Sequence, residues 1–396
     1  MIYLIIIFWF FIFLIFYSYI GYGILLYVLV KLKRIFFKQK SFDNIDYEPE
    51  VTLFVAAYNE KDYIDLKVKN SFDLDYPKEK IKHIWVTDGS NDGTPEQLKK
   101  YPDIQVYHQD KRGGKIGALN RGMKFVKTPI VIFSDGNTIL SKESIREIVD
   151  CFKNPKVGCV AGEKQIFNKE KDAAAGAGEG FYWKYESFLK KYDSELYSTV
   201  GAAGELFAIR TELFEKVEDN ILLDDFIISL RIAKRGYKIQ YAPKAYAQET
   251  SSANVKEELK RKIRISAGGI QSIIKLKSLL NVFKYKTLSF QYISHKVLRW
   301  IFVPFAMPVV FILNFIICYK FNLFLETNIY SILFWLQVLF YGLSIIGAIL
   351  QNYKIKAKLI FIPYYIFIMN LSVYYGLIRF LKGKQSVNWE RAKRGK

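Results

Sequence analysis

The sequence predicts an α/β domain with a Rossmann-like sheet, joined to an α-helical transmembrane region. In the first half of the chain, short runs of β-branched and aromatic residues alternate with helical patterns, which is typical of a sheet wound with helices. Four other segments of at least about 20 residues carry almost no charge, and that length spans roughly 30 Å of hydrocarbon. We therefore expect a folded domain held at a membrane.

The order of these features divides the chain into five parts. We expect a transmembrane anchor at residues 1–30, an α/β domain at 45–250, amphipathic interfacial helices at 251–296, about three transmembrane helices at 297–381 and a basic tail at 382–396. The opening segment has no basic start and no small-residue cleavage site, so we expect an anchor rather than a signal peptide.

Basic residues beside the apolar segments predict the orientation. The run Lys31-Leu32-Lys33-Arg34 follows the anchor directly, which places the α/β domain in the cytoplasm of a multi-pass protein of the plasma membrane. The basic tail also favours the cytoplasm, although three crossings after the domain would put that tail outside. The sequence leaves the side of the C-terminus open.

The formal net charge of +20 comes from 58 Lys and Arg against 38 Asp and Glu. We reject nucleic acid as a partner, because the basic residues flank membrane segments and form no recognisable nucleic-acid module; the lipid bilayer suits them better. The three cysteines lack metal-ligand spacing, and the three histidines are too few to favour zinc sites or serine triads. Nothing here predicts the oligomeric state.

The end of the predicted strand at residues 130–133 is the main candidate for a site of chemistry. The run Asp135-Gly136-Asn137 follows it, and open α/β sheets bind ligands at the carboxyl ends of their parallel strands. Asp135 and Asn137 both offer oxygen ligands that suit Mg²⁺ or Mn²⁺ shared with substrate phosphates, and Gly136 lets the backbone turn between them. The alternative is an ordinary Asp-Gly turn.

Three other segments complete a predicted nucleotide site. A first strand at residues 51–57 closes in Ala57-Tyr58-Asn59-Glu60, and a second ends at Asp88 in a loop of acids and hydroxyls that could grip a polar ring. Gly113-Gly114-Lys115 precedes a helix that carries Asn120, and such a helix start could cradle a phosphate. The glycine motif is weak alone, because it lacks the Walker spacing.

The second half of the domain offers candidate acceptor residues. Residues 179–186 combine aromatic and acidic side chains, so Trp183 and Glu186 could stack on a sugar and accept its hydroxyl hydrogen bonds. The alternative is that these aromatic residues belong to the core. Gly201 and Gly204, with the adjacent Glu205, would let a sugar chain approach the backbone closely.

Two adjacent acids, Asp224 and Asp225, are predicted to open a helix. They could simply favour its N-terminus, but activation of an acceptor needs a base, and neighbouring carboxylates can raise one pKa. Glu249 is expected to be structural or to assist this base. Farther along, Arg261 and Arg264 share one face of a basic amphipathic helix and could clamp a diphosphate.

The order of the segments at residues 51–60, 88–94, 114–120 and 135–137 resembles the nucleotide-sugar half of family 2 glycosyltransferases. More specifically, the chain is similar to the membrane-embedded branch that contains cellulose, chitin, hyaluronan and poly-N-acetylglucosamine synthases. The resemblance runs from the anchor to Trp389. It implies a GT-A fold, a UDP-sugar donor, a divalent metal ion and inversion at the anomeric carbon.

The resemblance also implies roles for residues of this chain. Asp88 would contact the uracil, Asp135 the diphosphate and the metal, and Asp225 would be the base, with Asp224 replacing the family's glutamate. The implied nucleotide-sugar site comprises Ala57, Tyr58, Glu60, Asp88, Lys115, Asn120, Asp135, Gly136, Arg261 and Arg264.

The sequence departs from the family pattern at two places. The family more often has Asp-x-Asp where this chain has Asp135-Gly136-Asn137, so the second metal ligand would be a neutral amide. Processive members carry Gln-x-x-Arg-Trp, of which only Arg264 is present here, since Ile265 replaces the tryptophan. Processivity, the sugar and the linkage therefore stay open.

The sequence thus predicts a membrane-bound, metal-dependent hexosyltransferase that adds a sugar from a UDP-sugar to a growing polysaccharide. Export through its own membrane helices is a further hypothesis, with a passage lined by Asn314, Gln337, Ser344, Asn370 and Ser372. These polar residues could instead join helices by hydrogen bonds. The alternatives are a glycosyltransferase that adds one sugar to a lipid-linked acceptor, and a non-catalytic nucleotide-binding or export subunit.

Overall fold

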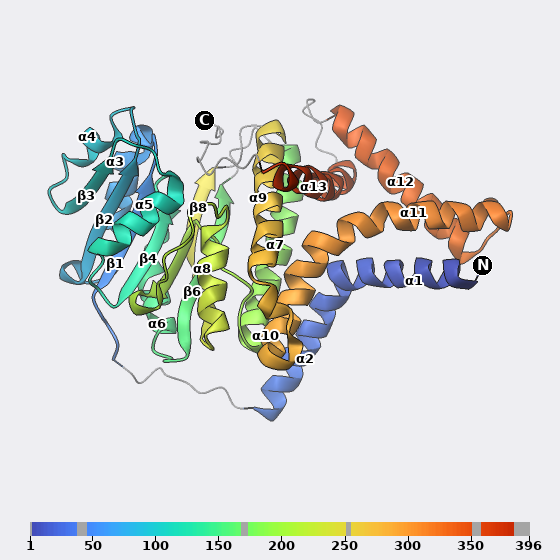
Figure 1. The fold of residues 1–396 in the computed structure, drawn as a ribbon, viewed down its shortest axis with the longest axis horizontal. Coiled ribbons are helices and arrows are strands. Elements are labelled where there is room, and N and C mark those ends of the chain that lie inside the picture. Colours follow the sequence, from blue (N-terminus) through green and yellow to red (C-terminus); the bar gives the residue numbers. More distant parts are fainter. Residues whose placement is uncertain (1, 38–45, 168–172, 251–254, 351–357, 384–396) are drawn as a thin grey trace.

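The structure is a computed structural model that describes residues 2–37, 46–167, 173–250, 255–350 and 358–383. Figure 1 shows an α/β domain on the left and the long apolar helices on the right, with α7 (Ala173–Leu196) and α9 (Val255–Lys275) standing between them. Almost all of the predicted basic tail, and the first residues of the predicted interfacial segment, lie outside the described residues.

Within the described residues, the α/β domain is built on one mixed sheet with the strand order β3-β2-β1-β4-β7-β6-β8-β5. The strands are β1 Val51–Ala57, β2 Ile81–Asp88, β3 Ile104–Gln109, β4 Ile130–Asp135, β5 Ile139–Leu140, β6 Val157–Phe167, β7 Leu206–Arg210 and β8 Lys238–Thr250. This α/β sheet confirms the predicted fold class.

The first four strands are parallel to one another and form the Rossmann-like half of the sheet. All seven residues of β1 are buried, as expected for a central parallel strand that is covered by helices on both faces. The register places Ala57 opposite Thr87 and Ala56 opposite Asp135. The carboxyl ends of β1, β2 and β4 therefore lie side by side, where the predicted nucleotide residues follow.

The second half of the sheet differs from a fully parallel, doubly wound arrangement. Strand β7 is antiparallel to both β4 and β6, and Leu206 at its start lies opposite Ser134 near the end of β4. The segment that precedes β7, which contains Gly201 and Gly204, is consequently brought next to Asp135. A local sequence pattern does not reveal this pairing, because it joins residues about 70 positions apart.

Helices cover both faces of the sheet. The helices of the domain are α3 Lys61–Phe72, α4 Thr94–Leu98, α5 Gly114–Gly122, α6 Ser144–Cys151 and α8 Asp224–Lys234, with short 3₁₀ helices at η2 Lys78–Lys80, η3 Met123–Phe125 and η4 Thr211–Leu213. Helix α5 packs on β1 and β2, and α8 packs on β6 and β8. The N-termini of α5 and α8 are the places where Lys115 and Asp225 occur.

Four segments of the described chain are long and apolar enough to cross a membrane: Ile2–Phe36, Val282–Lys320, Ile329–Leu350 and Ile362–Leu381. Their elements are α1 Ile2–Phe16, η1 Tyr17–Gly21, α2 Tyr22–Phe36, α10 Val282–Tyr292, η6 Ile293–Phe302, α11 Val303–Lys320, α12 Ile329–Leu350 and α13 Lys358–Leu381. The short helix η5 Lys277–Leu280 precedes the second segment. These helices are consistent with the predicted transmembrane region.

Helix α13 links the apolar helices to the α/β domain. It packs against α9 and α7 as well as against its neighbour α12, and Figure 1 shows it close beside α9. Gly376 of α13 permits this approach, because a Cβ atom there would lie 2.8 Å from the Ser266 side chain on α9. The apolar helices are therefore in direct contact with the elements that flank the predicted acceptor site.

We predict that Gly122→Ala destabilises the domain, whereas Gly117→Ala on the same helix does not. A Cβ atom at Gly122 would lie 2.5 Å from Phe54 and from Val86, while at Gly117 it would meet nothing within 4 Å. Overpacking of this kind typically costs about 1–3 kcal/mol, and Ala at an open helix position gains roughly 0.5–1 kcal/mol. Thermal unfolding of both variants measures the difference, and equal melting temperatures would contradict the packing described here.

Candidate active site

A small cavity lies at the carboxyl ends of β1 and β2, where the nucleotide was predicted to bind. Ala57, Tyr58, Asp88 and Lys115 line it together with Arg112. The Arg112 guanidinium stacks on the Tyr58 ring, with its central carbon 3.7 Å from the ring centroid. Our sequence interpretation did not include Arg112, although a basic residue directly before the glycine pair was a usable signal.

Asp88 organises the glycine loop at this cavity. Its Oδ2 atom accepts hydrogen bonds from the backbone N–H groups of Gly113 and Gly114, at 2.8 and 2.7 Å, and its Oδ1 atom pairs with Arg121 at 3.2 Å. Gly114 has a φ of +78°, which a residue with a side chain rarely adopts. Asp88 thus holds in place the helix start that carries Lys115. The contact of Asp88 with the uracil of a nucleotide stays a prediction.

Asn120 is engaged away from this cavity. Its amide donates to the carbonyl oxygen of Val217 at 2.8 Å and accepts from the Val217 N–H at 3.0 Å. Both polar atoms of the side chain are therefore used to fix a loop of the second half of the domain. This geometry favours a structural role for Asn120 over the nucleotide contact that the resemblance implied.

An ion pair joins the two motifs that were predicted to face the phosphates. The Lys115 Nζ atom donates to Asp135 Oδ1 at 2.8 Å. Burial raises the pKa of Asp135 above its ordinary value, even though Lys115 opposes the shift. Burial alone would lower the pKa of Lys115, but the nearby Asp135, Asp224 and Asp225 raise it, so Lys115 stays protonated.

A second buried lysine lies beneath Asp135. Lys67 on α3 is fully buried, and its Nζ atom donates to Ser134 at 2.7 Å and lies 3.4 Å from Thr138. Burial lowers the pKa of Lys67 to about 7, although Asp135 opposes the shift. This lysine fixes the turn that follows β4, and a sequence pattern gives no sign of it.

Asp224 and Asp225 begin α8 beside this ion pair. Burial and, next, the neighbouring Asp224 carboxylate raise the pKa of Asp225 to about 7. Asp224 is buried, and its Oδ2 atom has no hydrogen-bond partner among the described residues. A Cβ atom at Gly204 would lie 3.2 Å from both Asp225 Oδ2 and Lys115 Nζ, so a glycine lets the two groups approach this segment.

The predicted arginine pair divides between two sets of acids. Burial lowers the pKa of Arg264, and the charges that oppose this shift include Asp224, Asp135 and Asp225 of the acid cluster. Arg261 instead forms two hydrogen bonds of 2.9 Å to Glu258 on its own helix. Arg264 is therefore the member of this pair whose charge acts on Asp135, and its contact with a diphosphate stays a prediction.

Lys164 on β6 joins two acids at the far side of the site. It forms ion pairs with Glu205 and with Glu249, and it is almost completely buried. Burial favours a neutral Glu205, but Lys164 outweighs it and holds the pKa of Glu205 well below its ordinary value. Glu205 and Glu249 thus share one buried lysine in an ion cluster, which agrees with a structural role for Glu249.

The donor atoms fit a divalent ion that is held by few protein ligands. Asp135 lies at the strand end, Asn137 lies in the turn that follows, and Glu60 packs beside Gly136. No group of three or more His, Cys, Asp or Glu residues converges within the described parts of the chain. Asp135, Asp224 and Asp225 all act on Lys115, and Mg²⁺ or Mn²⁺ bound mainly by substrate phosphates would add positive charge to this acid cluster.

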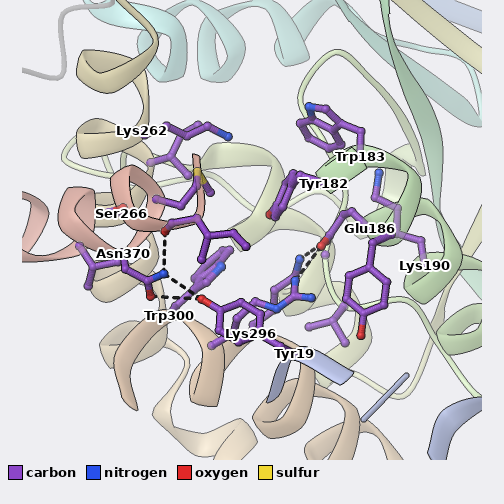
Figure 2. A pocket seen from close by; sticks show the side chains of 18 of the residues that line it. Tyr19, Tyr182, Trp183, Glu186, Lys190, Lys262, Ser266, Lys296, Trp300 and Asn370 are labelled. Atoms are coloured by element: carbon purple, nitrogen blue, oxygen red, sulfur yellow. Dashed lines mark hydrogen bonds and ion pairs between the residues drawn. The ribbon is translucent and has the colours of Figure 1, made fainter. Parts of the chain in front are cut away.

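A cavity of about 1010 Å³ is lined by Asp225 and by residues of the apolar helices. Figure 2 shows part of its lining. Its wall includes Gly201 and Glu205 from the predicted acceptor segment, and residues from all four candidate membrane spans. Trp183 also lines it, next to Tyr182. This volume is at the upper end of the roughly 300–1,000 Å³ that ligand pockets usually enclose.

Glu186 lines the same cavity but is already paired. It accepts hydrogen bonds from His295 at 3.1 Å and Arg299 at 3.0 Å, and also from Lys296. These three cationic or titratable groups belong to η6, so Glu186 ties α7 to an element within the candidate membrane span Val282–Lys320. The predicted hydrogen bonds from Glu186 to acceptor hydroxyls would have to compete with these partners.

The polar residues that we predicted along an export passage do not share one cavity. Of the five, only Asn370 lines the large cavity, and its amide is bonded to Tyr19 and to the Ile366 carbonyl. Ser344 and Ser372 donate to carbonyl groups of their own helices. These hydrogen bonds match the alternative interpretation, in which the polar groups serve helix structure and packing.

Residues 49–268, more than half of the chain, match the family described as Glycosyltransferase like family 2. The chain therefore belongs to this family, as the sequence resemblance predicted. The match covers the sheet, both acid motifs and the first part of α9.

Two bacterial relatives are similar to this chain in sequence. Poly-beta-1,6-N-acetyl-D-glucosamine synthase from Staphylococcus aureus (strain MSSA476) is 27% identical over 246 residues, which are 59% of this chain and 57% of the relative. The synthase of the same name from Staphylococcus epidermidis is 24% identical over 294 residues, which are 70% of this chain and 66% of the relative. The chain thus matches less than two thirds of the length of these relatives.

A solved structure shares the overall architecture. The mannosyltransferase PcManGT from Pyrobaculum calidifontis, in complex with GDP-Man and Mn²⁺, has a TM-score of 0.69 to this chain at 21% identity. The alignment covers 96% of this chain and 100% of that chain. Together with the family match, this likeness confirms the predicted GT-A fold.

We predict that Asp225→Asn lowers sugar transfer by about 10²- to 10⁴-fold, because an amide of the same shape cannot take a proton. Nucleotide binding should be nearly unchanged, since Asp135, Lys115 and the glycine loop are intact. Initial rates and calorimetric titration with UDP measure the two effects. Unchanged turnover would remove Asp225 from the mechanism.

The pH dependence gives an independent prediction for the same residue. With the pKa of Asp225 near 7, its basic form is lost as the pH falls, so kcat/KM should drop about tenfold per pH unit below 7 and level off above it. Initial rates at low donor concentration measure this profile. A flat profile between pH 5.5 and about 7 would contradict the assignment of Asp225 as the base.

Proposed function

We propose that the protein is a membrane-bound, inverting glycosyltransferase that transfers a sugar from a UDP-sugar to a hydroxyl group of a glycan or lipid-linked acceptor. The observation that carries this proposal is the position of Asp225. Its carboxyl lies in the large cavity, in the same acid cluster as the Lys115–Asp135 ion pair, and has a pKa of about 7. A base with such a pKa, placed between a phosphate site and an acceptor cavity, suits transfer to a hydroxyl.

The step is a single displacement. The acceptor hydroxyl oxygen attacks the anomeric carbon while Asp225 takes the hydroxyl proton, and the bond from that carbon to the diphosphate breaks on the opposite face. UDP departs with the bonding electron pair, and Asp225 later releases its proton to solvent. Lys115 and Arg264 stabilise the charge that develops on the diphosphate.

A divalent metal ion would add to this charge stabilisation, and Asp135 is the residue that would hold it, with Asn137 as a second candidate. Support comes from the acid cluster itself, which carries more negative than positive groups around Lys115. The solved mannosyltransferase was described with Mn²⁺ bound.

The donor and the acceptor are inferred from the relatives as well as from the site. The two staphylococcal relatives are named for a polymer of N-acetylglucosamine, which supports a polysaccharide product, whereas the solved mannosyltransferase is described with GDP-Man. The basic residues after the first span support a plasma-membrane protein whose α/β domain faces the cytoplasm. A non-catalytic subunit is less well supported, because Asp135, Asp225 and Lys115 meet in one site.

We expect Asp135→Ala to weaken metal-dependent UDP binding by about ten- to hundredfold, because the phosphates lose the charge-assisted link through a bridging cation. Titrations of UDP with Mn²⁺, with Mg²⁺ and with EDTA measure this effect. Asp150→Ala on α6, whose side chain is 60% exposed, is a matched control that should leave binding unchanged. Equal affinity with and without metal in the wild type would contradict a metal site here.

The activity itself is tested with a panel of labelled UDP-sugars and GDP-mannose. Purified protein in detergent is incubated with each donor and with Mn²⁺ or Mg²⁺, and products are separated by size. Transfer from a UDP-sugar supports the proposal, and a ladder of sizes would indicate a polymer. No transfer and no donor hydrolysis with any donor would overturn it.

A further inference from the structure

The large cavity has a composition that a free glycan does not suit. Apart from η6, the membrane helices contribute mainly apolar side chains to the cavity wall: Ile15, Ile20, Ile24, Met307, Phe340, Ile362, Ile366, Met369 and Val373. The polar side chains that these helices contribute are tyrosines and Asn370. Asn370 is already bonded to Tyr19 and to its own helix. A sugar chain placed here would lose hydrogen bonds to water and find few replacements, which is costly for each hydroxyl.

Charged groups gather at the end of the cavity that lies against the α/β domain. Lys190 and Lys262 come from α7 and α9, while Lys296 and Arg299 come from η6, and all four line the cavity. Figure 2 shows Lys190, Lys262 and Lys296 around the aromatic side chains of Tyr182, Trp183 and Trp300. Cations and aromatic rings thus line the same cavity as Asp225 and the apolar side chains.

Two of these cations keep unused hydrogen-bond donors. Lys190 is 7% exposed, and its Nζ atom makes no hydrogen bond within the described residues; its ion-pair partner, Glu163, is 3.7 Å away. Arg299 is 8% exposed and pairs with Glu186 through Nη1, while its Nε atom has no hydrogen-bond partner in the same parts of the chain. Buried donors without acceptors are rare and point to a ligand that supplies oxygen atoms.

From this arrangement we infer that the cavity binds a lipid-linked acceptor with three parts: a hydroxyl-bearing head, an anionic phosphate linker and a long apolar chain. The head lies at Asp225 and the Gly201–Gly204 segment, the linker at Lys190 and Arg299, and the chain against the wall formed by α1, α11 and α13. This inference rests on the proposed function, since the head must carry the hydroxyl that Asp225 deprotonates. The acceptor that enters the site is then an amphiphile and not a free polysaccharide.

The linker contact is tested with three synthetic acceptors and the donor found in the panel. The first carries a sugar on a farnesyl chain through a diphosphate, the second carries the same sugar on an octyl chain without phosphate, and the third is a free disaccharide. The wild type should use the first acceptor with a kcat/KM at least about tenfold above the other two, as one charge-assisted contact provides. Lys190→Met should raise KM for the first acceptor about tenfold without changing kcat or KM for the second, and Lys190→Arg should restore it.

The chain contact is tested on α13. Ile366→Trp fills the cavity and should raise KM for both lipid acceptors about tenfold, as the loss of a buried apolar contact predicts. Ile378→Trp on the same helix is the matched control, because Ile378 is 48% exposed and does not line the cavity. UDP affinity measured on every variant excludes general misfolding.

The possible results separate this inference from the proposed function. Equal or better use of the free disaccharide, or equal effects of Ile366→Trp and Ile378→Trp, would overturn the lipid-linked acceptor and leave the glycosyltransferase assignment standing. Loss of transfer to every acceptor in the Lys190→Arg variant would also overturn the linker contact. No transfer to any acceptor by the wild type would overturn the inference, and donor hydrolysis in the same samples would show whether the proposed function survives.

Discussion

The ion pair between Lys115 and Asp135 is the interaction on which the site depends. Placing charged groups in a buried environment costs several kcal/mol per ion, and the Lys115 ammonium repays this by facing Asp135 at 2.8 Å with Asp224 and Asp225 nearby. Lys115 comes from the nucleotide half of the domain and the aspartate pair from the acceptor half. Lys115 therefore connects the place where a leaving group departs, at Asp135, to the place where a nucleophile is activated, at Asp225.

This electrostatic arrangement also explains the states of the individual acids. Glu205 and Glu249 share the single positive charge of Lys164, and Glu205 still contributes to the raised pKa of Asp225. Lys115 opposes the raised pKa of Asp225, but burial and the neighbouring Asp224 keep that pKa at about 7. Positive charge brought in with the donor would lower the pKa of Asp225 and favour the basic form when the nucleotide is bound.

Local patterns were sufficient to predict the first half of the fold. Buried β-branched runs that end in polar residues marked β1, β2 and β4, because side-chain burial on both faces of a parallel strand leaves a continuous apolar run in the sequence. The antiparallel insertion of β7 and the packing of α13 on α9 are set by contacts between distant segments. No local sequence pattern predicts such contacts.

Local sequence patterns also predicted only part of the site. Asp135, Lys115 and Asp225 follow strand ends or helix starts, so their types and positions could be noticed in the sequence, and the structure brings them together. Asn120 also sits in a motif, but Val217 occupies both polar atoms of its side chain. Lys190 and Arg299 carry no motif, and they line one cavity although they lie about 110 positions apart on α7 and η6.

The central claim is that Asp225 activates an acceptor for direct displacement at the anomeric carbon, and the stereochemistry of the product tests it most directly. Proton NMR of the product formed from an α-linked UDP-sugar reports the configuration of the new bond. A single displacement assisted by one base predicts the β configuration. A product that retains the α configuration would require a different mechanism and would contradict the account.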